Sequence, residues 1–123
     1  SAYVDRGVVS YSNRAKVDLL GVPSELIDRH GAVSAEVAAA MARGIRERSG
    51  VSVGLSVTGI AGPGGATDTK PVGLVYVGLD GGAGQAMTQE FRFHGGDRNV
   101  IKQRSSQAAL DLLRRWLTKN RLT

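Results

Sequence analysis

Residues 51–58 and 72–79 read VSVGLSVT and VGLVYVGL, and these two stretches decide the fold. Each is short, rich in β-branched and apolar residues and interrupted by glycine, which is typical of a buried strand. Residues 59–71 between them are rich in glycine and show no helical pattern. Residues 80–84 (DGGAG) then favour a hairpin turn. A third strand is predicted over residues 87–93, where apolar and polar side chains alternate.

Helical patterns lie on both sides of these strands. Ser34 is a good N-cap for a helix that ends near residue 49, and Asp97 is one for a long helix to about residue 119. Pro23, as a first helical residue, favours a short helix that extends to about residue 29. Another short helix is predicted over residues 14–20, and the β-branched end of residues 4–11 predicts a strand.

This order of elements predicts an α/β fold. Strands separated by helices, with two hairpin-like strands in the middle, indicate a layered α/β domain with a mixed central sheet flanked by helices. No repeat or linker divides residues 1–123, so we expect a single domain. Residue 1 is Ser, and the first residues already resemble the middle of a domain. We therefore expect an N-terminal segment to be missing.

Composition excludes several classes of protein. The chain has 123 residues, of which 17 are glycine and none is cysteine. A hydrophobic share of 41% argues against wholesale disorder. No apolar run approaches the ~20 residues that a membrane helix needs, so no membrane partner is expected. Without cysteine there is no disulfide, thiolate metal site or cysteine nucleophile, and we expect a cytoplasmic protein.

The positive charge is concentrated at one end. The net charge is +5, yet residues 98–123 alone hold seven basic residues and one acid. At 100° per residue, Ala109, Leu112, Leu113 and Trp116 form one apolar stripe, and its extension predicts that Arg98 and Lys102 face the protein body. Nucleic-acid binding by this helix is a competing interpretation. It is disfavoured because two of its cations point inward and no aromatic residues lie between the others.

Three groups of residues are candidates for a site. The loop over residues 59–65 (GIAGPGG) has backbone N–H groups that an anion can approach closely, or it is only a mobile connection. Thr58 precedes it at a strand end, where α/β sheets place ligands. Tyr11 and Lys16 together can supply a general base and the charge that tunes it. The alternative is that they are a packed tyrosine beside a solvated lysine. Arg98 grips a phosphate, or it pairs with a carboxylate of this chain such as Asp5 or Asp97.

Several motifs together resemble one family. They are YSNxxK from Tyr11 to Lys16, LGV at residues 20–22, TGIAGPGG at residues 58–65, KPVG at residues 70–73 and GDR at residues 96–98. In this combination the chain resembles the C-terminal domain of the competence-damage protein CinA, over essentially its whole length. TGIAGPGG together with YSNxxK is the most specific part of the likeness.

The resemblance implies an activity and a set of site residues. Members of the family include homodimeric nicotinamide-nucleotide amidases, which hydrolyse the carboxamide of nicotinamide mononucleotide to the acid and ammonia without metal or other cofactor. Tyr11 and Lys16 correspond to the catalytic tyrosine and lysine, and Thr58 and Arg98 to substrate-binding residues. The loop backbone is expected to line the same pocket, through Gly59, Ala61, Gly62 and Gly64.

The sequence departs from the family pattern at two points. The nucleophilic serine of the family lies in a Ser-Cys-Thr-Gly-Gly motif upstream of the tyrosine, and this chain contains no such motif. Relatives often carry a second arginine where this chain has Lys102, which is a weaker bidentate ligand. We therefore expect the serine to lie upstream of residue 1. The alternative is a non-catalytic regulatory or partner-binding domain, inactive as these 123 residues.

Overall fold

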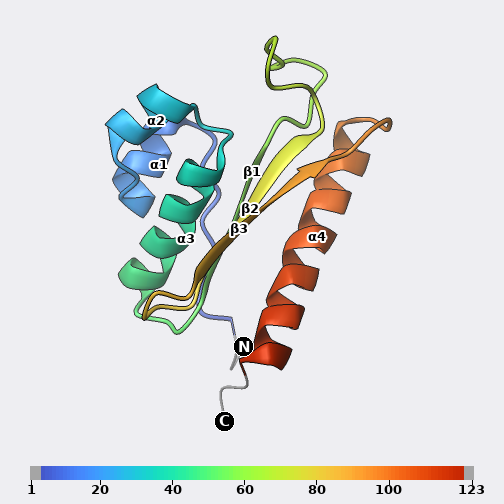
Figure 1. Ribbon diagram of the computed structural model, residues 1–123. Coiled ribbons are helices and arrows are strands. Elements are labelled where there is room, and N and C mark those ends of the chain that lie inside the picture. Colours follow the sequence, from blue (N-terminus) through green and yellow to red (C-terminus); the bar gives the residue numbers. More distant parts are fainter. Residues whose placement is uncertain (1–3, 121–123) are drawn as a thin grey trace.

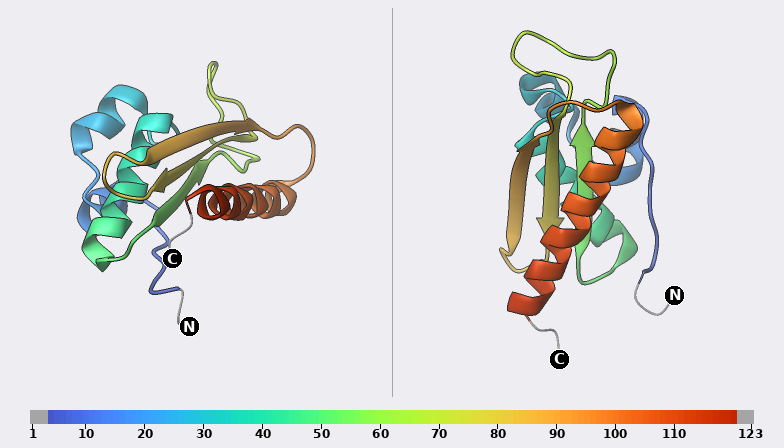
Figure 2. Two further views of the ribbon diagram at one scale, coloured as in Figure 1. Left: turned by 60° about the horizontal axis from the view of Figure 1, so that its bottom comes forward. Right: turned by 90° about the vertical axis from the view of Figure 1, so that its right-hand side faces the viewer.

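The computed structural model describes residues 4–120 as an antiparallel sheet between two layers of helices (Figure 1). The three strands, in the spatial order β1-β2-β3, are β1 (Gly54–Gly59), β2 (Leu74–Asp80) and β3 (Ala86–Arg92). Three helices precede them: α1 (Asn13–Leu20), α2 (Ser24–His30) and α3 (Ala35–Ser49). The last helix, α4 (Arg98–Lys119), covers the opposite face of the sheet (Figure 2).

The helix ends follow the predicted capping residues. The hydroxyls of Ser12 and Ser34 accept from the backbone N–H groups of Ala15 and Val37, at the starts of α1 and α3. The Asp97 carboxylate accepts from the N–H of Val100 at the start of α4. Each cap satisfies a donor that the helix itself leaves unpaired. Pro23 differs slightly from the prediction, because it is the N-cap of α2 and not its first helical residue.

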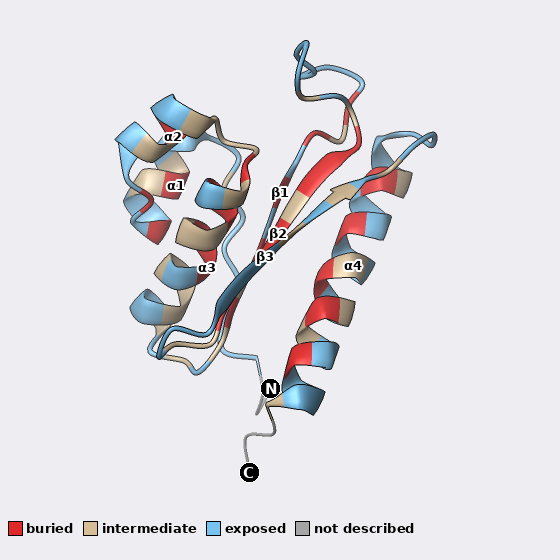
Figure 3. Ribbon diagram, in the orientation of Figure 1, coloured by how far each residue is buried: buried red, intermediate tan, exposed pale blue. Residues whose placement is uncertain are grey.

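The main core lies between the sheet and α4. Val75, Val77 and Leu79 of β2 pack against the buried stripe of α4 (Figure 3). On the opposite face of the sheet Ser56 of β1 lies beside Gly78 of β2, and α3 approaches these two residues closely. There the hydroxyl of Ser56 donates to the carbonyl of Ala38 at 2.6 Å. A Cβ added at Gly78 would lie 2.4 Å from the same carbonyl oxygen. Glycine in β2 is therefore what allows α3 to pack directly on the sheet.

The α/β class is confirmed, but the sheet is not mixed among residues 4–120. β1 pairs antiparallel with β2, and β2 pairs antiparallel with β3. A mixed sheet requires a further strand, and residues 4–11, predicted to be one, form no strand in the structure. Their β-branched composition favours extended backbone, but a strand also needs a hydrogen-bonding neighbour, and none of the described strands pairs with this segment. The segment runs lengthwise along the molecule beside β1 (Figure 2).

Candidate functional site

One cavity of about 790 Å³ runs along the free side of β1. Its walls come from residues 4–11, α1, α3, the whole of β1 and the side of α4 at the border of its packed face. Most of the predicted site residues line it, namely Tyr11, Lys16, Thr58, Gly59, Ala61 and Arg98. Gly62 and Gly64 are not among the lining residues. The structure thus brings together residues that are up to 87 positions apart in the sequence.

Lys16 is a buried cation with no anion beside it. It lies on α1, which the Ser12 cap and the left-handed Gly21 hold at its two ends, and only 8% of its surface is exposed. No carboxylate among the described residues lies within 4.0 Å of its ammonium group. Burial therefore lowers the pKa of Lys16 below its ordinary value. A lysine in this state has the property that a general base requires.

Tyr11 occupies a different environment from Lys16. It precedes the α1 cap, and 89% of its surface is exposed, although it borders the same cavity. None of the hydrogen bonds among residues 4–120 joins the phenol to the lysine. The predicted Tyr11–Lys16 pair is thus present as two lining residues and not as a hydrogen-bonded unit.

Thr58 anchors the end of β1 to the helical layer. Its side chain is buried, and its hydroxyl donates to the carbonyl of Ala32 at 2.8 Å. The hydroxyl oxygen keeps lone pairs with which it can accept a further hydrogen bond. Gly59 follows, and a Cβ there would lie 2.7 Å from a methyl carbon of Val75. A side chain at residue 59 would therefore require Val75 to move.

Arg98 reaches the cavity from the first residue of α4. One of its guanidinium nitrogens donates to the carbonyl of Gly62 at 3.2 Å, which ties the helix start to the glycine-rich loop. Within the described range, no carboxylate lies within 4.0 Å of Arg98 or Lys102: Asp97 caps α4, and Asp5 pairs with Arg6. The expectation of an internal ion pair is therefore not met. Arg98 keeps donors that can bind an anion in the cavity.

The prediction that both cations face the protein body is wrong in detail. Arg98 and Lys102 are exposed. The buried stripe of α4 consists of Ile101, Ser105, Ala109, Leu112 and Trp116. Ile101 and not Lys102 continues the stripe, because one residue of displacement rotates a side chain by about 100°. The two cations lie at the border of the packed face, where they line the cavity and keep contact with water.

A family model for the CinA C-terminal domain matches residues 1–117. The chain belongs to the CinA C-terminal domain family. The CinA-like protein of Geotalea daltonii is 56% identical over 117 residues, covering 95% of this chain and 28% of that protein. The CinA-like protein of Mycolicibacterium vanbaalenii is 52% identical over 118 residues, covering 96% and 28%. This CinA domain therefore spans about 28% of the length of these curated relatives.

Solved structures agree with this assignment. The competence/damage inducible protein CihA from Agrobacterium tumefaciens superposes with a TM-score of 0.85 at 42% identity, covering 89% of this chain and 66% of the other. A CinA superfamily protein from Escherichia coli gives a TM-score of 0.78 at 34% identity, covering 84% and 59%. The solved relatives thus contain the fold described above together with further residues.

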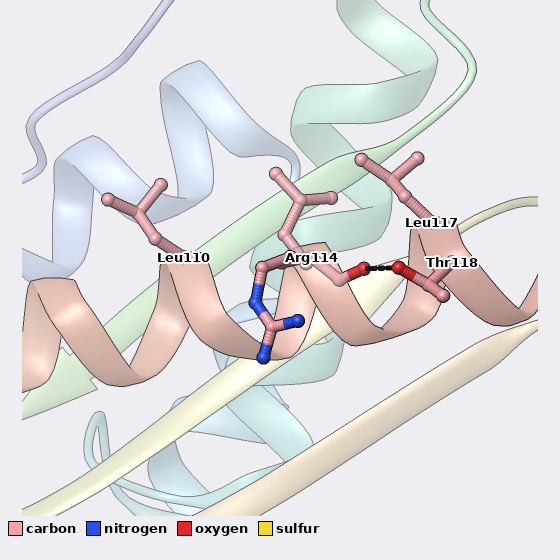
Figure 4. A pocket seen from close by; sticks show the side chains of 5 residues that line it. Leu110, Arg114, Leu117 and Thr118 are labelled. Atoms are coloured by element: carbon pink, nitrogen blue, oxygen red, sulfur yellow. Dashed lines mark hydrogen bonds between the residues drawn. The ribbon is translucent and has the colours of Figure 1, made fainter.

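Two features of the CinA domain escaped prediction from the sequence. The cavity extends past the predicted site to Ser49 and Leu113, which carry no motif that marks them as lining residues. A second, shallow pocket of about 420 Å³ lies over Leu110, Leu113 and Leu117 of α4 (Figure 4). Periodicity places Leu113 in an apolar stripe, but it does not show that Leu110 and Leu117 beside it are exposed in the described structure. Between residues 4 and 120, no three side chains of the metal-binding types gather in one place. No described helix is long and apolar enough to span a membrane.

Proposed function

We propose that this protein is a nicotinamide-nucleotide amidase, which hydrolyses the carboxamide of nicotinamide mononucleotide to nicotinate mononucleotide and ammonia. The observation that carries the proposal is Lys16, a buried lysine with no carboxylate partner in residues 4–120, on the same cavity as Arg98. A buried lysine whose pKa is lowered and a guanidinium at one cavity match a reaction that needs a base at the amide and an anchor at the phosphate.

The proposed chemistry uses a serine upstream of residue 1. The Lys16 amine accepts the proton of the serine hydroxyl as its oxygen attacks the amide carbon. The resulting oxyanion is stabilised by backbone N–H groups of the loop after Thr58. The C–N bond then breaks as the Lys16 ammonium gives its proton to the departing –NH2 group, which leaves as ammonia. Water hydrolyses the acyl-enzyme by the same steps and releases nicotinate mononucleotide and the serine.

The remaining residues bind the substrate and complete the pocket. Arg98 holds the 5′-phosphate beside the N-terminus of α4, while the Thr58 hydroxyl oxygen accepts a hydrogen bond from the nucleotide. Tyr11, at the cavity border, is proposed to close over the nicotinamide ring and to orient the Lys16 amine when substrate is present. The protein is further proposed to act as a homodimer, which light scattering on the purified protein tests.

Replacing Arg98 distinguishes an effect on substrate binding from an effect on the chemical step. We expect Arg98→Ala, in a longer protein that includes the upstream serine, to raise KM for nicotinamide mononucleotide by about 10- to 100-fold, with kcat changed only a few-fold. A lost charge-assisted hydrogen bond is worth about 1.5–3 kcal/mol. Steady-state ammonia release measures both constants.

A matched control tests the specificity of this effect. Arg104 lies on the same helix and donates to the carbonyl of His94, away from the cavity lining. Arg104→Ala should leave KM unchanged. Nicotinamide riboside, which lacks the phosphate, should be turned over equally by the wild type and by Arg98→Ala. A large effect of Arg98→Ala on the riboside would show that Arg98 does not hold the phosphate.

The pH dependence follows from the direction of the Lys16 shift. The base is the neutral amine, so kcat/KM for the longer protein should rise with pH as Lys16 loses its proton. Because burial lowers the pKa of Lys16, this rise should be centred below 10.5, the ordinary value for lysine. Arg98→Ala should keep the same profile at a lower level. Activity that falls with pH over this whole range would exclude Lys16 as the base.

A further inference from the structure

The connection between α2 and α3 joins two side chains that come from distant parts of the sequence. The carbonyl of His30, the last residue of α2, accepts a hydrogen bond from the Lys70 ammonium group. Two residues later, the carbonyl of Ala32 accepts one from the Thr58 hydroxyl. Lys70 belongs to the loop between β1 and β2, which lies at the same end of the molecule as this connection (Figure 1). Lys70 and Thr58 are therefore linked through the backbone of residues 30–32.

Residues 30–32 are also held by contacts in the middle of this segment. The carbonyl of Gly31 accepts from the Ser34 hydroxyl at 2.9 Å, and Ser34 caps α3. Gly31 has a φ of +81°, a value that favours glycine. A Cβ at this residue would lie 2.8 Å from the Lys70 ammonium nitrogen, so the head of the lysine packs directly on the backbone. Three successive carbonyls of this connection thus have side-chain donors.

Lys70 is placed so that its ammonium group meets the C-terminal end of α2. Its backbone N–H donates to the Thr67 hydroxyl oxygen at 3.1 Å, and its carbonyl accepts from the Thr67 N–H at 2.9 Å. These two hydrogen bonds close a tight turn at the base of the lysine side chain. Within residues 4–120, no carboxylate lies within 4.0 Å of the ammonium group. The last carbonyls of a helix have no partner within the helix, so a cation at this end satisfies one of them.

The Thr58 hydroxyl has a single proton, and that proton is directed at the Ala32 carbonyl. A carbonyl oxygen can only accept, so Thr58 is the donor in this hydrogen bond. On the cavity side the Thr58 oxygen is consequently restricted to accepting, and the group that it binds must carry an N–H or an O–H. A threonine without such an anchor has other side-chain rotamers available, and these direct the hydroxyl elsewhere.

We infer that Lys70 is a positioning residue for Thr58: it fixes the α2–α3 connection, and this connection keeps the Thr58 oxygen turned toward the cavity as a hydrogen-bond acceptor. Lys70 does not line the cavity, so it acts without touching a ligand. The inference rests on the proposed function only in taking nicotinamide mononucleotide as the ligand, whose carboxamide and ribose supply N–H and O–H donors. The effect on the Thr58 side chain is expected in the free protein as well.

The side-chain rotamer of Thr58 tests the inference without any ligand. Three-bond couplings of its methyl carbon, measured by nuclear magnetic resonance on the longer protein, report the χ1 angle. We expect one rotamer in the wild type and a mixture of rotamers in Lys70→Met. Lys70 is half-buried and methionine keeps most of its volume, so the variant should fold. Lys119→Met makes the same change at the end of α4 and should keep one rotamer. A single, unchanged rotamer in Lys70→Met would overturn the inference.

A double-mutant cycle tests whether Lys70 acts through Thr58. In the longer protein we expect Lys70→Met to raise KM for nicotinamide mononucleotide by about 5-fold and to leave kcat nearly unchanged, which is the effect of one weakened neutral hydrogen bond. Thr58→Val removes the acceptor itself, so in that background Lys70→Met should change KM by less than about 2-fold. Equal effects of Lys70→Met on KM in the two backgrounds would show that the lysine does not act through Thr58.

The two measurements distinguish this inference from the proposed function. A wild-type protein that releases no ammonia would contradict the amidase proposal, and the Thr58 rotamer would then decide the role of Lys70 by itself. Ammonia release by the wild type, together with unchanged Thr58 couplings in Lys70→Met, would support the amidase and reject Lys70 as a positioning residue.

Discussion

Lys16→Met in the longer protein is expected to lower kcat for ammonia release from nicotinamide mononucleotide by about 10²- to 10⁴-fold, the usual contribution of a general base. Methionine keeps most of the volume of lysine and removes the buried charge. KM should change little, because Lys16 contacts the reacting group and not the phosphate. The measurement is steady-state kinetics of ammonia release.

The stability of the same variant distinguishes a catalytic role from a structural one. Lys16 is buried without a carboxylate partner among the described residues, so its charge opposes folding. Lys16→Met should therefore unfold at the same urea concentration as the wild type or at a higher one. A structural lysine would give the opposite result, with lower stability accompanying the lower activity. Unchanged kcat would remove Lys16 from the mechanism.

Gly44→Ala is expected to give the largest loss of stability. Gly44 lies within α3, and a Cβ there would lie 1.7 Å from the carbonyl oxygen of Leu20. Alanine improves helix propensity by about 1 kcal/mol. The clash with backbone outweighs this gain, because α1 must move away from α3 and open the core around Leu20, Val22 and Met41. We expect a net loss of about 3 kcal/mol in the free energy of unfolding.

Urea unfolding followed by circular dichroism measures this loss. Gly7→Ala makes the same chemical change at a position with nothing within 4 Å of the added Cβ, and it should change stability by less than about 0.5 kcal/mol. Because Leu20 ends the helix that carries Lys16, Gly44→Ala should also lower activity. Wild-type stability in Gly44→Ala would show that α1 and α3 do not pack as described.

Local chemistry predicted most of the fold. Ser34 and Asp97 cap the starts of their helices as predicted. The strand predicted over residues 87–93 forms as β3 over Ala86–Arg92. Residues 4–11 were beyond such reasoning. Their composition favours extended backbone. Whether a strand forms depends on a hydrogen-bonding neighbour strand, which the local sequence does not specify.

The roles of the candidate site residues stay predictions, but the structure shows which of them line one cavity. Lys16, Thr58 and Arg98 line one cavity, as the motifs indicated. The burial of Lys16 and its lowered pKa come from the packing of α1, which spacing alone does not reveal. Arg98 lies at the border of the packed face, because small differences in helix rotation decide between burial and contact with water. Gly64 belongs to the predicted glycine-rich loop, but it does not line the cavity.

The central claim is that the cavity beside β1 hydrolyses the carboxamide of nicotinamide mononucleotide. Its most direct test is to incubate this substrate with the longer protein and to quantify ammonia and nicotinate mononucleotide together. We predict that the two products form in equal amounts and that both are lost in Lys16→Met. Unchanged nicotinamide mononucleotide, with a folded protein that includes the upstream serine, would contradict the claim and favour a non-catalytic binding domain.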